Sequence, residues 1–183
     1  MAHFDENRTN EVATVLLSVV VPMKNEGVVL DAFFLELLPI LESITLNFEV
    51  IVVNDGSDDD TLTRLLGHQR QDPRISVLDL SRNFGKEAAL TAGMEFSKGQ
   101  AVVTMDADLQ HPPKLLLEMV TRWREGYEMV IACRSDRNSD SFIKRWTAGW
   151  FYSLINNIAD HCCLIVFKKE KTAYIQQVVA LVA

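Results

Sequence analysis

The amino-acid sequence predicts an α/β fold in which one mostly parallel sheet carries helices on both of its faces. Short, continuous apolar runs recur along the chain, as in strands that are buried on both sides. Segments of helical length and period separate these runs, and this alternation predicts right-handed crossovers between parallel strands. The 183 residues are 48% hydrophobic and 23% charged, which suits one ordinary globular domain with a sizeable core.

Five apolar runs give the expected strands. They cover residues 15–22, 49–53, 75–80, 101–105 and 129–132. Four segments with a helical period lie between them, at residues 28–41, 59–70, 87–97 and 113–124. The chain is therefore expected to alternate strand and helix from residue 15 to residue 132.

Residues at the expected helix ends support these boundaries. The Ser-Asp-Asp run at residues 57–59 can cap the second helix, because its side-chain oxygens accept hydrogen bonds from first-turn N–H groups. The His-Pro-Pro run at residues 111–113 places proline where a first helical turn tolerates it. We expect Gly99 and Gly126 to close the third and fourth helices.

Charge and cysteine content exclude several classes of partner and location. A net charge of -7 argues against nucleic acid, because a surface that follows phosphates needs an excess of Lys and Arg. Cys133, Cys162 and Cys163 have neither metal-ligand spacing nor the pattern of a disulfide framework, which indicates a reducing cytoplasm. The N-terminal residues do not resemble a secretory signal. The longest uncharged run, residues 12–23, is about half of the roughly 20 residues that a membrane-spanning helix needs, so we expect no such helix.

Polar segments follow four of the expected strands. They are residues 22–26, 54–57, 81–86 and 106–110. Ligands of open parallel sheets bind beyond the carboxyl ends of the strands, so these segments are the candidate site.

Asp106 and Asp108 are separated by one residue at the end of a buried strand. Their hard oxygen atoms suit Mg²⁺ or Mn²⁺, which usually bind through one or two carboxylates together with substrate phosphates. The pair therefore predicts a diphosphate bridged to the protein by a metal ion. A solvated turn explains an isolated Asp-x-Asp equally well.

Two further strand ends carry residues that suit a nucleotide. Asp55, followed by Gly56, can accept hydrogen bonds from a base or a ribose, although a helix-capping turn has the same sequence. Gly85 and Lys86 place a flexible backbone beside a cation, which suits a phosphate, although a surface lysine is the common alternative. The shared position of these residues at one edge of the sheet favours a binding site.

Five segments in order resemble the family 2 glycosyltransferases, in the branch that makes polyprenyl-phosphate sugars. That branch includes dolichol-phosphate mannosyltransferases and bactoprenol glucosyltransferases. The segments are LSVVVPMKNEG, EVIVVNDGSDDDT, LSRNFGKEAALTAGM, VVTMDADLQHPP and VIACRSDR. The resemblance runs from about residue 17 to about residue 160, and it implies the GT-A fold, a Rossmann-like arrangement.

The resemblance implies which residues bind the nucleotide. Pro22, Asn25 and Glu26 match the loop that holds it. Asp55 matches the carboxylate that faces the base, and Lys86 resembles a contact to the nucleotide or its phosphates.

The resemblance also implies the residues of the reaction centre. Asp108 matches the direct metal ligand, while Asp106 belongs to the same metal motif and lies nearer the ribose. Gln110 lies where the donor sugar is expected. Arg134 and Arg137 resemble the cations that meet the diphosphate or the acceptor phosphate. We expect the catalytic residues to be Asp106, Asp108, Gln110 and Arg134.

The expected function is transfer of a hexose, with inversion, from a nucleotide-diphosphate sugar to a polyprenyl phosphate. A non-catalytic module that only binds the nucleotide sugar is the main alternative. A phosphatase of the haloacid dehalogenase type also uses Asp-x-Asp, but usually after its first strand. A dehydrogenase would carry a Gly-x-Gly-x-x-Gly fingerprint after the first strand, where this chain has PMKNEG.

The last part of the chain departs from the family pattern. Residues 1–160 form the expected nucleotide-sugar-binding domain, and residues 161–183 form a divergent tail such as a truncated or frameshifted gene gives. Residues 141–158 carry an aromatic stripe that resembles an amphipathic helix near the membrane surface. The stripe predicts either peripheral contact with the inner face of a membrane or an ordinary core-facing helix.

Overall fold

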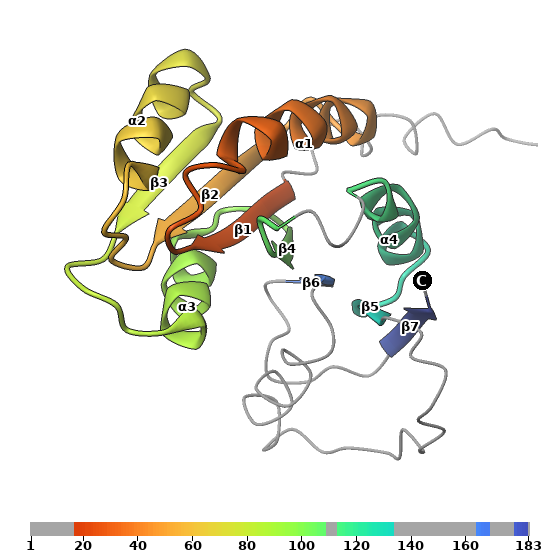
Figure 1. The fold of residues 1–183 in the computed structure, drawn as a ribbon. Helices are drawn as coiled ribbons and strands as arrows, with labels where there is room; N and C mark the ends of the chain where they lie inside the picture. Colours follow the sequence, from red (N-terminus) through yellow and green to blue (C-terminus); the bar gives the residue numbers. More distant parts are fainter. Residues whose placement is uncertain (1–16, 109–112, 134–163, 169–177, 183) are drawn as a thin grey trace, which may run out of the picture.

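The computed structural model describes residues 17–108, 113–133, 164–168 and 178–182. Its strands form one sheet in the order β3-β2-β1-β4-β6-β5-β7 (Figure 1). The strands are β1 (Leu17–Met23), β2 (Phe48–Asn54), β3 (Ile75–Asp79), β4 (Ala101–Met105), β5 (Met129–Cys133), β6 (Leu164–Lys168) and β7 (Val178–Val182). The helices are α1 (Leu30–Ile44), α2 (Thr61–Gln71), α3 (Lys86–Phe96) and α4 (Leu115–Arg124).

The sheet is mostly parallel, which confirms the predicted fold class. Strand β1 is an interior strand, which pairs in parallel with β2 on one side and β4 on the other. Strand β3 extends the parallel set beside β2. Strand β6 runs antiparallel between β4 and β5, and β7 pairs in parallel with β5. The five predicted strands are all present, whereas β6 and β7 were not predicted.

Helices cover both faces of the sheet, as expected. Helices α1, α2 and α4 lie on one face, and α3 lies on the other (Figure 1). Side chains of successive strand residues point to opposite faces, so Val19 and Val21 pack in the core under α1 while Val20 packs against α3. All three valines are fully buried. Burial on both faces explains why these strands read as unbroken apolar runs.

The helix ends agree with the sequence in part. Asp59 accepts a hydrogen bond from the backbone N–H of Thr61 at 3.0 Å, so one residue of the predicted capping run supports the first turn of α2. Gly126, with φ of 107°, follows the C-terminal end of α4 as predicted. The prediction for Gly99 was wrong, because α3 already ends at Phe96. A Cβ atom on Gly99 would lie 2.6 Å from the backbone nitrogen of Ser18, so glycine is needed there for close chain packing.

Within the part of the chain that the structure describes, no helix is both long enough and apolar enough to cross a membrane.

Helix α3 approaches the sheet closely at Gly93. A Cβ atom built on Gly93 would lie 2.3 Å from Cγ1 of Val20 and 3.0 Å from Cγ2 of Val53. Both valines are fully buried, so neither can move aside without disturbing the core. The absence of a side chain at Gly93 therefore sets the distance between α3 and the sheet, and with it the position of the first residue of α3, Lys86.

We predict that Gly93→Ala and Gly67→Ala change stability in opposite directions. In α3 the added methyl group overpacks the core at a cost of about 1–3 kcal/mol, which exceeds the gain of about 1 kcal/mol in helix propensity. In the middle of α2, nothing lies within 4 Å of the Cβ position of Gly67, so only the gain remains. Urea unfolding of both variants measures the two changes. A Gly93→Ala variant as stable as Gly67→Ala would contradict the close packing of α3.

Candidate functional site

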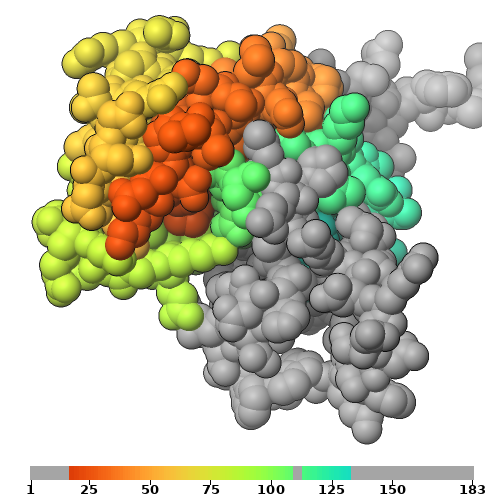
Figure 2. Space-filling view, viewed as in Figure 1, coloured from red at the N-terminus to blue at the C-terminus, as the bar shows by residue number. Residues whose placement is uncertain are grey.

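A cavity of about 330 Å³ lies at the carboxyl ends of β1, β2 and β4. Figure 2 shows the segments that meet there, with the red-to-orange chain after β1, the yellow-green chain around α3 and the green end of β4 side by side. The residues that line the cavity are Pro22, Met23, Lys24, Glu26, Asp55, Asn83, Gly85, Lys86, Asp106, Ala107 and Asp108. The four polar segments that follow the first four strands therefore do meet, except that the end of the last one lies outside the described residues.

The loop after β1 is held by the loop after β2. Asn25 adopts a φ of 56°, a left-handed conformation that asparagine tolerates better than most residues. Its backbone N–H donates to Oγ of Ser57 at 2.9 Å, and its side-chain oxygen accepts the N–H of Asp58 at 2.9 Å. The N–H of Glu26 donates to Oγ1 of Thr61 at 2.9 Å. Pro22 and Glu26 line the cavity, whereas Asn25 lies outside the lining and braces the loop.

Asp55 holds the loop that leads into α3. Its side chain is only 4% exposed, and its two carboxylate oxygens accept the backbone N–H groups of Phe84 at 2.7 Å and Gly85 at 2.9 Å. A buried carboxylate needs such donors, since burial without them is costly. Gly56 packs tightly beside this contact, because a Cβ atom there would lie 2.5 Å from the backbone of Arg82. Asp55 thus lines the cavity and also fixes the start of α3.

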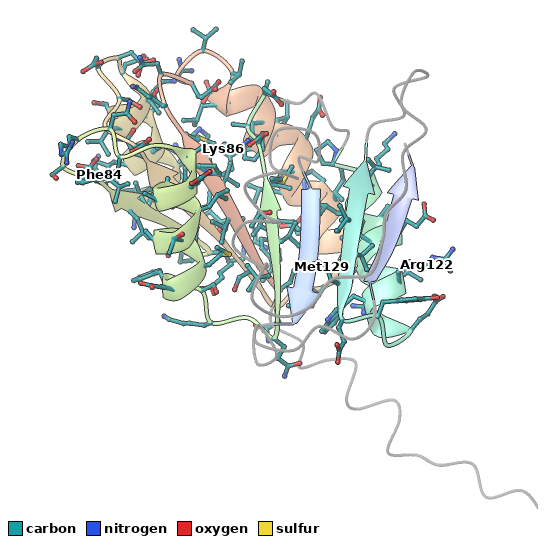
Figure 3. The ribbon with its side chains drawn as sticks, turned by 90° about the horizontal axis from the view of Figure 1, so that it is seen from below. Phe84, Lys86, Arg122 and Met129 are labelled. Carbon is teal, nitrogen blue, oxygen red and sulfur yellow. The ribbon has the colours of Figure 1, made fainter. Side chains whose placement is uncertain are left out.

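Lys86 and Asp106 form an ion pair across the cavity. The ammonium nitrogen of Lys86 lies 2.8 Å from Oδ1 and 2.9 Å from Oδ2 of Asp106. Lys86 is the first residue of α3, and Asp106 directly follows β4. Figure 3 shows Lys86 at the start of α3, on the side of the strands, while Phe84 lies further out at the edge of the molecule. The side chains are 44% and 21% exposed, so the pair adds little stability but places opposite charges at the cavity wall.

The carboxyl group of Glu26 lies close enough to Asp106 and Asp108 to be affected by their charges. Partial burial raises the pKa of Glu26 above its ordinary value, and the negative charges of Asp108, Asp106 and Asp59 raise it further. Asp106 is partly buried, and Asp108 is exposed at the rim. This concentration of negative charge favours a bound cation.

The carboxylates of the cavity fit a divalent metal ion whose coordination is completed by a substrate. Among the described residues, no group of three or more His, Cys, Asp or Glu side chains is arranged to hold a metal ion alone. Mg²⁺ and Mn²⁺ do not require such a cage, because they bind through one or two carboxylates, phosphate oxygens and waters. Asp106 and Asp108 are the residues that would hold the ion.

Several expected site residues lie outside the described part of the chain. They are Gln110, Arg134 and Arg137, together with the aromatic stripe at residues 141–158. Their predicted roles stay predictions.

Two polar residues that line the cavity were not predicted as site residues from the sequence. Lys24 and Asn83 both fall in the polar strand-end segments, so their position was the only signal for them. The bracing roles of Ser57 and Thr61 were missed as well, because they depend on contacts between loops far apart in the sequence.

Comparisons with known proteins agree with this geometry. The chain is 44% identical over 143 residues to the uncharacterized glycosyltransferase YkcC of Bacillus subtilis, a match that covers 78% of this chain and 44% of that protein. It is 39% identical over 143 residues to the bactoprenol glucosyl transferase of Shigella phage SfV, covering 78% of this chain and 47% of that protein. The chain thus spans less than half the length of the curated relatives it matches.

A solved structure shows the same fold. It is a mannosyltransferase from Pyrobaculum calidifontis in complex with GDP-Man and Mn²⁺, with a TM-score of 0.65, and the match covers 91% of this chain and 56% of that one. At 18% identity this similarity shows the fold alone, that of the GT-A glycosyltransferases. The sequence model of glycosyl transferase family 2 matches residues 18–172, which is most of the chain. The chain belongs to glycosyl transferase family 2.

Proposed function

We propose that this chain carries the donor site of an inverting glycosyltransferase, which moves a hexose from a nucleotide-diphosphate sugar to a polyprenyl phosphate. One observation carries the proposal. The carboxylates of Glu26, Asp106 and Asp108 and the ammonium group of Lys86 line a single cavity at the carboxyl ends of adjacent parallel strands. This is where open α/β sheets bind nucleotides.

The chemistry of the cavity supports a diphosphate donor. Asp106 and Asp108 offer hard oxygen ligands for Mg²⁺ or Mn²⁺, and a diphosphate supplies the remaining ligands and neutralises the charge of the ion. Lys86 offers a cation to the same phosphates. The solved mannosyltransferase that shares this fold is in complex with GDP-Man and Mn²⁺, which supports a sugar nucleotide and a divalent ion here.

The acceptor is proposed from the curated relatives and from the reaction. The relative from phage SfV is named a bactoprenol glucosyl transferase, and bactoprenol is a polyprenyl lipid. A phosphate acceptor is already anionic near neutral pH, so it needs less help from a general base than a hydroxyl group would. Direct displacement at the anomeric carbon by this phosphate inverts the configuration there.

The residues of the cavity would stabilise the leaving group. As the bond between the sugar and the nucleoside diphosphate breaks, negative charge develops on a phosphate oxygen. A bound divalent ion supplies Lewis-acid stabilisation of that charge. Lys86, which lines the same cavity, would donate a hydrogen bond to the same oxygen atoms. Arg134 and Arg137 are proposed to neutralise the acceptor phosphate.

We propose that the reaction takes place at the inner face of a membrane. Sugar nucleotides are water-soluble, whereas the phosphate of a polyprenyl lipid lies at the membrane surface. The donor cavity must therefore face that surface when both substrates are bound. The aromatic stripe at residues 141–158 stays the candidate for this contact.

Two alternative functions, one enzymatic and one not, have no better support. The Asp-x-Asp pair follows β4, whereas a phosphatase of the haloacid dehalogenase type usually has it after the first strand. A module that binds the donor without transferring the sugar would share the whole cavity described here. Only turnover separates that alternative from the enzyme.

We predict that donor binding depends on a divalent ion through Asp108. Calorimetric titration with UDP-glucose and GDP-mannose, with and without Mn²⁺, should detect binding of at least one of them that strengthens with the ion. Asp108→Asn should abolish that strengthening, because the amide is a poorer metal ligand than the carboxylate. Asp58→Asn is the matched control, since Asp58 is exposed in a neighbouring loop and lies outside the cavity lining. An Asp108→Asn variant with the metal response of the wild-type protein would refute the assigned site.

We further predict sugar transfer to lipid. The protein is incubated with labelled UDP-glucose or GDP-mannose, Mn²⁺ and vesicles that contain polyprenyl phosphate, and the label is measured in the lipid fraction. The proposal requires labelled lipid that depends on the polyprenyl phosphate. Metal-dependent donor binding without any labelled lipid would instead support the non-catalytic module.

A further inference from the structure

We propose that Lys86 is an exchangeable counter-ion, which occupies Asp106 until the diphosphate of the donor draws it away. The divalent ion then binds tightly only together with the nucleotide. This inference rests on the proposed function, because the donor is taken to be a nucleotide-diphosphate sugar. It goes further by assigning Lys86 a role in coupling the binding of the two ligands.

The first step of the argument is the geometry of the ion pair. The ammonium nitrogen of Lys86 lies within hydrogen-bonding distance of both carboxylate oxygens of Asp106, at 2.8 and 2.9 Å. A metal ion that used either oxygen would come close to this ammonium group, and two cations would then repel each other. The metal and Lys86 therefore compete for Asp106.

The second step is that Lys86 can leave while its backbone stays in place. Its side chain is 44% exposed, and an ion pair that open to water is weak. The lysine side chain is a flexible stem with a compact charged end, so the ammonium group can turn to a new partner. The backbone just before it is fixed, because Asp55 accepts the N–H groups of Phe84 and Gly85. The backbone of Lys86 is thus held in place, while its ammonium group can move.

The third step is the charge balance of the cavity. Four carboxylates line it, those of Glu26, Asp55, Asp106 and Asp108, together with the two cations Lys24 and Lys86. If a divalent ion alone displaces Lys86 from Asp106, the ammonium group is left beside a doubly charged cation. If a diphosphate arrives with the ion, its oxygen atoms accept hydrogen bonds from the ammonium group and also ligate the metal. The favourable arrangement therefore needs both ligands.

Coupling of this kind is reciprocal. A nucleotide that removes Lys86 from Asp106 raises the affinity for the metal, and the metal raises the affinity for the nucleotide by the same factor. The ion pair between Lys86 and Asp106 would weaken the binding of a metal ion in the absence of the nucleotide.

The test compares Mn²⁺ binding by the wild-type protein and by Lys86→Met in the absence of any nucleotide. Electron paramagnetic resonance of free Mn²⁺ gives the dissociation constant directly. Removal of the competing cation should tighten Mn²⁺ binding by about three- to tenfold, the range expected for loss of an exposed ion pair and one nearby positive charge. Saturating UDP or GDP should then strengthen Mn²⁺ binding less in Lys86→Met than in the wild-type protein.

Lys24→Met is the matched control. It removes the same charge from the lining of the same cavity, but among the described residues Lys24 makes no ion pair with Asp106. Its affinity for Mn²⁺ alone should change by less than about twofold, because only a more distant charge is lost. Thermal unfolding of both variants checks that the fold is intact.

Two results would overturn the proposal. One is a Lys86→Met variant that binds Mn²⁺ alone no more tightly than the wild-type protein does, including the case in which neither binds it. The other is an equal tightening in Lys24→Met, which would assign the effect to net charge rather than to the ion pair. If the protein binds no sugar nucleotide, the proposed function is refuted. The measurement with Mn²⁺ alone would still decide whether Lys86 and the metal ion compete for Asp106.

Discussion

The parallel pairing of β1 with both β2 and β4 is the constraint on which the site depends. Parallel strands end at the same edge of a sheet, so three loops of different parts of the chain are forced together there. Glu26, Asp55 and Asp106 each follow one of these strands, and the pairing brings them to one cavity. Burial on both faces in turn stabilises the pairing, because the strands are covered by helices on either side.

The loops themselves are held by hydrogen bonds between backbone and side chains. Asn25 and Ser57 join the loops after β1 and β2. Asp55 holds the loop between β3 and α3 through the N–H groups of Phe84 and Gly85. Each loop is thus held by its neighbour as well as by hydrogen bonds within the loop, such as the one that the N–H of Gly85 donates to the side chain of Asn83. This support leaves Lys86 and Asp106 at defined positions while their charged ends stay accessible, which a site for a charged, exchangeable ligand requires.

Local patterns predicted the fold and the edge of the sheet at which the cavity lies, whereas contacts between distant segments could not be predicted from them. The apolar runs that become β1, β2 and β4 are visible in the sequence because burial on both faces leaves no polar alternation. Strand β6 was missed although residues 164–167 are apolar, since its insertion between β4 and β5 depends on tertiary pairing. Asp55 and Lys86 were predicted as site residues, but their contacts were not. Asp55 accepts hydrogen bonds from two backbone N–H groups, and Lys86 pairs with Asp106. These contacts link residues that are 20 to 30 positions apart, so no local pattern indicates them. Gly99 was taken for a helix end because its contact with Ser18, 81 residues away, has no local signature.

Diffraction from crystals grown with Mn²⁺ and UDP or GDP, measured at a wavelength where manganese scatters anomalously, tests the central claim most directly. The account predicts an anomalous peak between the carboxylates of Asp106 and Asp108 and the diphosphate of the nucleotide, with the ammonium group of Lys86 turned from Asp106 to a phosphate oxygen. A manganese peak or a nucleotide at any other place on the molecule, with this cavity empty, would contradict it.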